Sequence, residues 1–301
     1  MAIMKVTDPN FITILRCTEC HHDGLQIKED ALICLNCSNK FPAKNNQIIL
    51  LEKELLAQQS QYQEEIKSPI NRLKSFLKRW PWLYQALTYA IGSISYFWGS
   101  PKKAAEKYMG APELGNKIVI NLGSGTKRLH PAMINLDIFP FENVDFITDA
   151  TKLPIKDSSV DIVITESTLE HIPDADAAIK EICRVVKPGG YVYVSIPFVF
   201  PFHASPNDYM RLTDKGLKNK FSVFEPIEIG MRGGPGSALA TFLMYFLSLP
   251  FSIISTSLYH FASYFMMLIL TPLRLLDLIF VLFPASCEAA AIVYFIGRKQ
   301  K

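Results

Sequence analysis

Five short apolar runs, rich in Val and Ile, alternate with polar segments in the middle of the chain. They occupy residues 117–122, 133–136, 144–148, 160–165 and 190–197. Runs of this length and composition, bounded by glycine or polar clusters, are typical of buried β-strands. Buried strands separated by longer segments favour an α/β fold with a parallel sheet. The pattern therefore predicts an α/β domain.

Each of the first four runs is followed by a glycine turn or ends at an acidic residue. Gly123 and Gly125 follow the first run, and Asp137, Asp149 and Glu166 end the next three. Glycine lets the backbone turn sharply and approach a ligand closely. Because the carboxyl ends of parallel strands meet at one edge of a sheet, where ligands bind, this order predicts a single crevice.

The order of these features resembles the class I S-adenosylmethionine (SAM)-dependent methyltransferases of the type 11 kind. The resemblance covers about residues 105–230. It rests particularly on two motifs, Leu169-Glu170-His171 and Val185-Val186-Lys187-Pro188-Gly189-Gly190. It implies a Rossmann-like fold in which the glycine turn holds the methionine part of SAM. It further implies that Asp137 binds the ribose hydroxyls and that Asp149 lies near the adenine amine. The implied cofactor-binding residues are Asn121, Gly123, Ser124, Gly125, Asp137, Ile138, Asp149, Ala150 and Glu166.

The chain departs from the family pattern at the glycine turn. In the family, an acidic residue is usual two places before the first glycine, where this chain has Asn121. The family's third glycine is replaced here by Lys127. Gly123 and Asp137 are 14 positions apart, fewer than the roughly 20 of a dinucleotide fingerprint. We therefore expect the first crossover helix to be short or nearly absent, and the spacing argues against NAD.

Two Cys-x-x-Cys pairs, Cys17 with Cys20 and Cys34 with Cys37, lie near the start of the chain. Four thiolates in this arrangement favour a structural zinc site, although two disulfides or a redox pair would use the same residues. Through Phe41-Pro42 and residues 48–51 the segment resembles the zinc ribbon of Trm112-like methyltransferase partners. We expect a ribbon over residues 1–51 with a core of its own, stabilised by metal binding.

Residues 52–104 are predicted to form a linker and a helical arm. Residues 66–105 contain seven basic and no acidic residues, interleaved with aromatic ones. This composition is typical of a membrane-surface helix, and equally of a solvated basic helix whose aromatics pack on the catalytic domain. The net charge of +3 does not indicate nucleic-acid binding. Residues 1–15 lack the charged and then apolar layout of a signal peptide.

A long apolar segment separates the last two predicted strands, residues 221–229 and 289–297. Between Arg232 and Arg274 there is no Asp, Glu, Lys or Arg, and the apolar insert spans residues 238–283. Its length suits a membrane span, but Pro250 and Pro272 interrupt it, and the chain must return to the sheet. An interfacial helical hairpin, an even number of crossings and a buried dimer face all remain open.

The loop after the fifth predicted strand concentrates polar side chains on the expected acceptor side of the pocket. His203, Asp208, Tyr209 and Arg211 are candidates for orienting or deprotonating an acceptor, as is His171. Alternatively, Asp208 and Arg211 form a local ion pair that only shapes the loop. His171 would then have only a capping or packing role at the start of the helix after the fourth strand.

Together these features predict a class I methyltransferase domain over residues 105–301, with the insert between its last two strands. The function expected from the resemblance is SAM-dependent methyl transfer to oxygen or nitrogen of a small or lipid-linked acceptor. We expect a cytoplasmic protein at the inner face of a membrane, with a homodimer left open. The alternative is a degenerate methyltransferase that acts as a membrane-tethered adaptor, which Asn121 and Lys127 favour.

Overall fold

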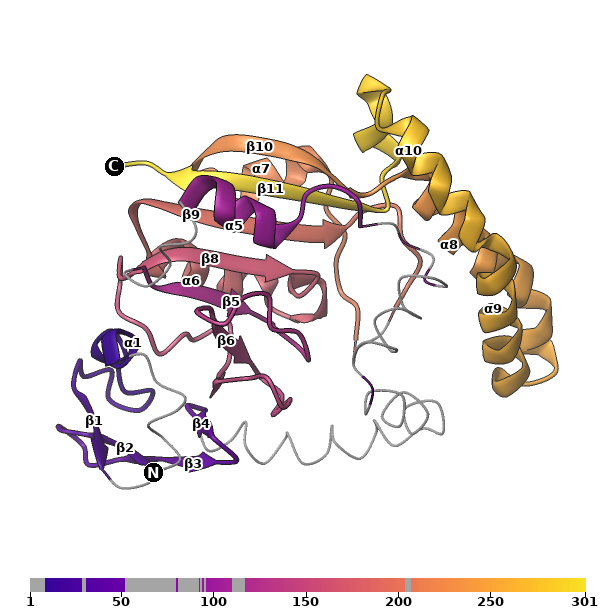
Figure 1. The fold of residues 1–301 in the computed structure, drawn as a ribbon. Coiled ribbons are helices and arrows are strands. Elements are labelled where there is room, and N and C mark those ends of the chain that lie inside the picture. The colour runs from indigo at the N-terminus through magenta and orange to yellow at the C-terminus, as the bar shows by residue number, and fades with distance from the viewer. Residues whose placement is uncertain are drawn as a thin grey trace.

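The computed structural model describes residues 9–28, 31–51, 80, 92, 94, 96–109, 117–203 and 207–301. Most of the predicted linker and basic arm therefore lies outside the described residues. A sheet of 11 strands in the order β1-β2-β3-β4-β7-β6-β5-β8-β9-β11-β10 runs through the molecule (Figure 1). The prediction of an α/β sheet is confirmed.

The class I part of the sheet contains five parallel strands and an antiparallel pair. The parallel strands are β5 (Val119–Leu122), β6 (Ile134–Asp137), β7 (Phe146–Ile147), β8 (Val160–Glu166) and β9 (Val186–Pro197). β11 (Ile292–Lys299) pairs antiparallel with both β9 and β10 (Phe224–Gly233). The last two strands pair as predicted, but each begins three residues later than expected.

Helices cover both faces of this sheet (Figure 1). α5 (Pro101–Met109) packs through Ala104 and Ala105 on one face. α6 (Ala175–Val185) and α7 (Asp214–Lys220) pack on the other, and the 3-10 helix η3 (Leu169–His171) follows β8. Residues 123–133, which join β5 to β6, are all described and contain no helix. The expectation that the first crossover helix is short or nearly absent is confirmed.

The cysteine-containing segment continues the same sheet rather than forming a separate one. It comprises α1 (Pro9–Thr13), β1 (Leu25–Lys28), β2 (Ala31–Cys34), β3 (Lys40–Lys44) and β4 (Gln47–Ile49). β4 pairs parallel with β7, with Ile48 opposite Phe146. Phe11 and Ile48 belong to the main core cluster, and the Phe11 and Phe146 rings lie 4.8 Å apart. The expectation of a separate ribbon core is wrong, because the short strand β7 leaves an edge that β4 occupies.

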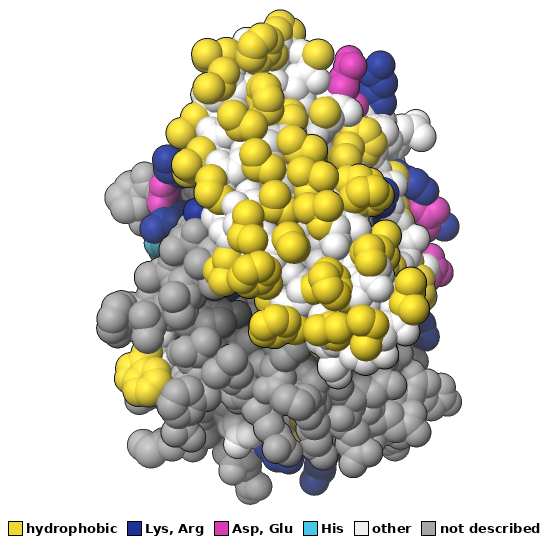
Figure 2. All heavy atoms as spheres, turned by 90° about the vertical axis from the view of Figure 1, so that its right-hand side faces the viewer, with side chains coloured by type: hydrophobic (Ala, Val, Ile, Leu, Met, Phe, Trp, Pro, Cys, Tyr) yellow, Lys and Arg dark blue, Asp and Glu magenta, His cyan; other side chains and the backbone are white. Residues whose placement is uncertain are grey.

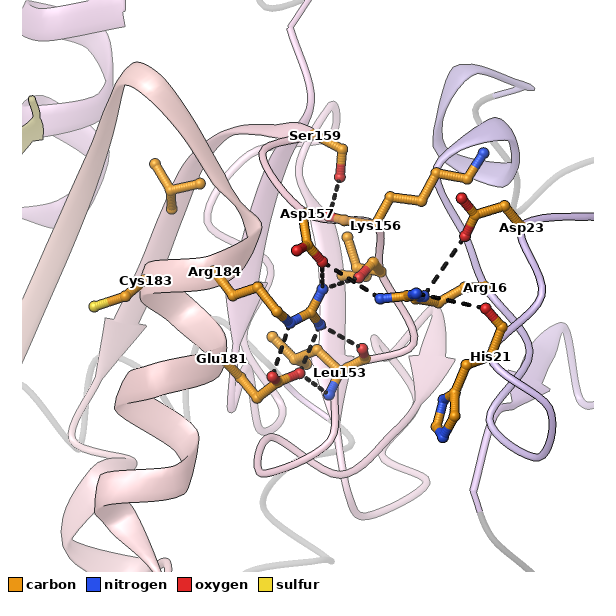
Figure 3. Close-up of polar contacts among 12 residues, drawn as sticks. Arg16, His21, Asp23, Leu153, Lys156, Asp157, Ser159, Glu181, Cys183 and Arg184 are labelled. Atoms are coloured by element: carbon orange, nitrogen blue, oxygen red, sulfur yellow. Dashed lines mark hydrogen bonds and ion pairs between the residues drawn. The ribbon is translucent and has the colours of Figure 1, made fainter. Parts of the chain in front are cut away.

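Charged side chains also join this segment to the class I part (Figure 3). The Arg184 guanidinium donates to Asp157 at 2.7 Å and to Glu181 at 2.6 Å. Arg16, from the cysteine segment, reaches the same Asp157 oxygen at 3.3 Å. These hydrogen bonds, with Arg184 as the first cause, hold the pKa of the Asp157 carboxyl below its usual value. The two parts are thus docked by both apolar and polar contacts.

A set of apolar helices lies between β10 and β11. They are α8 (Pro235–Ser248), η4 (Leu249–Ile253), α9 (Thr256–Leu270), η5 (Thr271–Leu276), α10 (Asp277–Phe280) and η6 (Pro284–Ala289). The buried carboxylate of Asp277 accepts hydrogen bonds from the Gly236 amide and the Ser237 hydroxyl, both at 2.6 Å. An anion at this position satisfies the free amides at the start of α8. Asp277 therefore fixes the end of the insert against its beginning.

The insert helices expose a broad apolar face on one side of the molecule (Figure 2). Phe246, Ile254, Phe261 and Leu282 are among its exposed side chains. The segments Pro235–Ile253 and Thr256–Phe280 are each long and apolar enough to cross a membrane, by length and composition alone.

Candidate functional site

A pocket of about 280 Å³ lies at the carboxyl edge of the parallel strands. Its lining includes five of the nine predicted cofactor residues, namely Asn121, Gly123, Ser124, Gly125 and Glu166. Gly123 and Gly125 have backbone φ angles of +70° and +56°, which residues other than glycine rarely adopt. The turn after β5 therefore forms the floor of a hollow, as the strand pattern predicts.

Asp137 closes this turn from the end of β6. One carboxylate oxygen accepts the Gly125 amide at 2.8 Å, and the other accepts the Phe139 amide at 2.9 Å. Burial raises the pKa of this carboxyl, and the two amides partly oppose the shift. Each oxygen has a further lone pair, so the carboxylate could also accept from the two hydroxyls of a ribose.

Two further observations indicate that the residues of the turn could bind SAM. The hydroxyl of Ser124 is buried and has no hydrogen-bond partner within the described part of the chain. A Cβ added to Gly125 would meet no atom within 4 Å, because that position opens into the pocket. A ligand in the hollow could therefore satisfy Ser124 and approach Gly125 closely.

Glu166 is held at the pocket wall by Arg232, at the end of β10. The guanidinium donates to Glu166 at 2.8 Å and to the Trp98 carbonyl at 2.9 Å, and it lies 4.7 Å from the centre of the Tyr96 ring. Tyr96 also lines the pocket. Sequence reasoning missed Arg232 and Tyr96 as site residues. The sequence feature that could have identified Arg232 is its position as the last charged residue before the apolar segment.

The predicted adenine neighbour, Asp149, faces a different hollow. It lines a cavity of about 230 Å³ together with Arg16 and Cys17 of the cysteine segment. Its carboxylate accepts from the Thr151 amide and hydroxyl, both at 2.8 Å. Ala150 and Ile138 are half-buried and pack in core clusters. The structure therefore does not bring Asp149 into the pocket of the glycine turn.

On the expected acceptor side, the loop after β9 is fixed by an internal ion pair. Arg211 binds Asp208 with both terminal nitrogens and donates to the carbonyls of Phe200 and Pro201. Burial would raise the pKa of Asp208, but hydrogen bonds from Arg211 and the His203 amide outweigh it and hold the pKa well below its usual value. Tyr209 is half exposed. Asp208 and Arg211 thus shape the loop.

The same loop brings His203 next to His171, with ring centres 4.9 Å apart. Burial, followed by the charge of His171, lowers the pKa of His203. Glu170 lies beneath them, fully buried, and burial raises the pKa of this carboxyl to about 8. In the sequence, Glu170 was considered only as part of the Leu169-Glu170-His171 motif, and it was not predicted to be a site residue.

The four paired cysteines converge as predicted. Cys17 and Cys37 have sulfurs 3.6 Å apart, and those of Cys20 and Cys34 are 3.5 Å apart. All four are free thiols whose sulfurs lie within 4.8 Å of one another. Thiolates at tetrahedral zinc, with bonds of about 2.3 Å, lie roughly 3.8 Å apart. The cluster therefore fits a zinc ion.

Comparison with known proteins finds similarity to methyltransferases in the class I part of the chain. The family described as "Methyltransferase domain" matches residues 127–194. Demethylmenaquinone methyltransferase of Streptomyces avermitilis is 42% identical over 65 residues, which is 21% of this chain and 28% of that protein. Sterol 4-C-methyltransferase strm-1 of Caenorhabditis elegans is 34% identical over 80 residues, 27% of this chain and 21% of that protein. The chain spans about a quarter of the length of these relatives.

Among solved structures, a SAM-dependent methyltransferase of Thermotoga maritima, titled a possible histamine N-methyltransferase, is similar to this chain. Its TM-score is 0.42 at 18% identity, and the match covers 74% of this chain and 98% of that one. A complex of the Haloferax volcanii Trm112 methyltransferase activator with a methyltransferase gives a TM-score of 0.37 at 16% identity, covering 66% and 94%. The domain match and the named relatives show that residues 127–194 resemble a methyltransferase domain.

Proposed function

We propose that this protein transfers a methyl group from SAM to a small or lipid-linked acceptor at a membrane surface. The observation that carries the proposal is the closed glycine turn, in which Asp137, from behind the pocket lining, accepts a hydrogen bond from the amide of Gly125, which lines the pocket. The methyltransferase domain match over residues 127–194 supports it.

SAM, when bound, supplies an activated methyl group on a sulfonium. The protein's contribution is mainly to position the reactants, which can supply much of the rate of such a transfer. In this proposal Gly123, Ser124 and Gly125 hold the amino-acid end of SAM and Asp137 holds the ribose. In the same proposal His171, His203 and Tyr209 face the acceptor, and their polar groups favour oxygen or nitrogen as the methylated atom.

The apolar insert supports the membrane part of the proposal. β10 is parallel to β9, so α8 begins at the same edge of the sheet as the pocket. In Figure 1 the arrowheads of β8 and β9 point toward the side on which α8 and α9 lie. An apolar face there could enter the lipid interface while the pocket faces the same surface. Relatives named for menaquinone and sterol methylation are consistent with a lipophilic acceptor.

The cysteine cluster has a structural role in this proposal. Zinc bound by Cys17, Cys20, Cys34 and Cys37 would stabilise the segment that supplies β4 to the sheet. Four thiolates fill a tetrahedral shell and leave no open position for chemistry.

Calorimetry with SAM tests the cofactor site. We expect purified full-length protein to bind SAM and Asp137→Ala to bind it more weakly by about 1.5–3 kcal/mol, because a charged hydrogen-bond acceptor is lost. Asp149→Ala is a matched control, since this carboxylate binds Thr151 and lines a different cavity, whereas Asp137 binds the glycine turn. Wild-type protein that binds no SAM at millimolar concentration would refute the methyltransferase proposal.

A further inference from the structure

Glu170 and His171 on η3 and His203 on the loop after β9 bring three potential ligand atoms together. One atom from each lies within 4.8 Å of the other two. We propose that these residues form a binding site for a divalent transition-metal ion, separate from the cysteine cluster. The site would use two imidazole nitrogens and one carboxylate oxygen.

The state of Glu170 is the first argument. Its side chain is fully buried, and neither carboxylate oxygen has a hydrogen-bond partner among the described residues. The nearest basic group is the Nε2 atom of His171, at 3.8 Å from Oε1. Burying a carboxyl group without hydrogen-bond partners is unfavourable, most of all in its ionised form. A bound cation would remove this penalty, because it offers the carboxylate a direct bond.

The orientation of His171 is the second argument. Its Nδ1 atom lies 2.6 Å from the backbone carbonyl of Asn207. A carbonyl only accepts hydrogen bonds, so Nδ1 carries the proton and Nε2 keeps its lone pair. Nε2 is also the atom that faces Glu170. Metal-binding histidines are typically oriented in this way, by a backbone or carboxylate acceptor on the other ring nitrogen.

His203 has the same arrangement with a carboxylate in place of the carbonyl. Its Nδ1 atom faces Asp208 Oδ2 at 3.5 Å, and the same oxygen accepts the His203 amide at 2.8 Å. Asp208 is in turn fixed by Arg211, which neutralises its charge. Each histidine thus has its Nδ1 atom beside an acceptor, which leaves its Nε2 atom available to a metal ion. This shared orientation is unexpected for residues that only fill space.

The donor set indicates the class of ion. Imidazole and carboxylate suit Zn²⁺, Fe²⁺, Co²⁺ and similar ions, and sites with three protein ligands keep an open position. Ligand atoms of a tetrahedral zinc lie roughly 3.4 Å apart. The His171 Nε2 and Glu170 Oε1 atoms are 3.8 Å apart and the whole cluster lies within 4.8 Å, so the three side chains would move closer together on metal binding.

The open position gives the ion a role in the proposed methyl transfer, and this part rests on that proposal. η3 begins directly after Thr168, whose hydroxyl lies 3.3 Å from the carbonyl of Gly123 in the cofactor turn. An acceptor oxygen bound to the ion would therefore sit beside the cofactor pocket. A metal ion lowers the pKa of a bound hydroxyl, so the ion would help the acceptor to lose its proton to water before or as the methyl group is transferred.

The experiment uses full-length protein supplied with one equivalent of zinc per chain, which the four thiolates take up first. Cobalt(II) is then added and its visible absorption is followed. We expect one Co²⁺ to bind per chain without the intense sulfur-to-metal charge transfer that cysteine ligands give. Glu170→Gln, His171→Ala and His203→Ala should each abolish this binding. Asp208→Asn should weaken it about 10–100-fold, as a change to a supporting partner does.

His260→Ala is the matched control, because this exposed histidine lies on α9, away from the cluster. Its Co²⁺ binding should equal that of wild-type protein. Circular dichroism of each variant separates loss of the site from loss of the fold. Zinc-loaded wild-type protein that binds no Co²⁺, or a folded Glu170→Gln variant that binds it normally, would overturn the proposal. Calorimetry with SAM on the same samples distinguishes this failure from failure of the methyltransferase proposal.

Discussion

At the scale of single residues, the two glycines of the cofactor turn are required for different reasons. A Cβ on Gly123 would lie 2.1 Å from the Thr168 side chain, whereas a Cβ on Gly125 would meet nothing within 4 Å. Both residues have positive φ. The first glycine is therefore needed by the fold itself, whereas a side chain at the second would enter the open space of the pocket that it lines.

We accordingly expect Gly123→Ala and Gly125→Ala to behave differently. Gly125→Ala should lower the free energy of unfolding by only about 1–2 kcal/mol, the usual cost of left-handed backbone, yet strongly reduce SAM affinity. Gly123→Ala should destabilise the fold more, because the clash with Thr168 adds to the backbone cost. Urea unfolding and calorimetry measure the two effects. Equal loss of stability in both variants, with SAM binding intact in Gly125→Ala, would contradict this assignment.

At the scale of elements, the pairing of β4 with β7 makes the cysteine segment part of the main sheet. Ile48 and Phe11 contribute to the same core as the class I strands. Zinc removal should therefore affect more than the ribbon, since folding of a metal-stabilised segment is coupled to ion binding.

We expect zinc removal by a strong chelator, or Cys34→Ser, to lower the midpoint of the single unfolding transition of the whole protein. Cys183→Ser is a matched control, because this half-buried cysteine lies outside the cluster on α6. Near-ultraviolet circular dichroism and tryptophan fluorescence should report coincident transitions. A ribbon that unfolds in a separate earlier step, leaving the class I midpoint unchanged, would show that the two parts are independent after all.

The sequence predicted the class I sheet well because its signals are local. Short apolar runs, the glycine turn after β5 and the acid at Asp137 are each readable within a few residues. The pairing of β4 with β7 was not predictable in this way, since it joins residues about a hundred positions apart. The contact of Arg232 with Glu166 and the convergence of Glu170 with His203 are likewise long-range.

At the scale of the whole molecule, the pocket and the apolar face lie toward the same side. The insert exposes Ile253, Phe261 and Leu282, at 89%, 68% and 78% of their surface. Exposed apolar patches of this extent mark sites of interaction with a membrane or another protein. Because α8 starts at the carboxyl edge of the sheet, a bilayer contacted by the insert would lie close to the pocket.

The most direct test of the account is transfer of labelled methyl from SAM in the presence of lipid vesicles that contain a bacterial lipid extract. We predict that wild-type protein places label in the organic-soluble fraction. Ile253→Asp combined with Phe261→Asp and Leu282→Asp should bind SAM normally yet transfer far less label, because each lost side chain weakens membrane burial by about 1.5–3 kcal/mol. Leu35→Asp, on the exposed surface of the cysteine segment, should transfer label as wild-type protein does. Wild-type protein that binds SAM but labels neither lipid nor soluble acceptors would contradict the account and favour an adaptor.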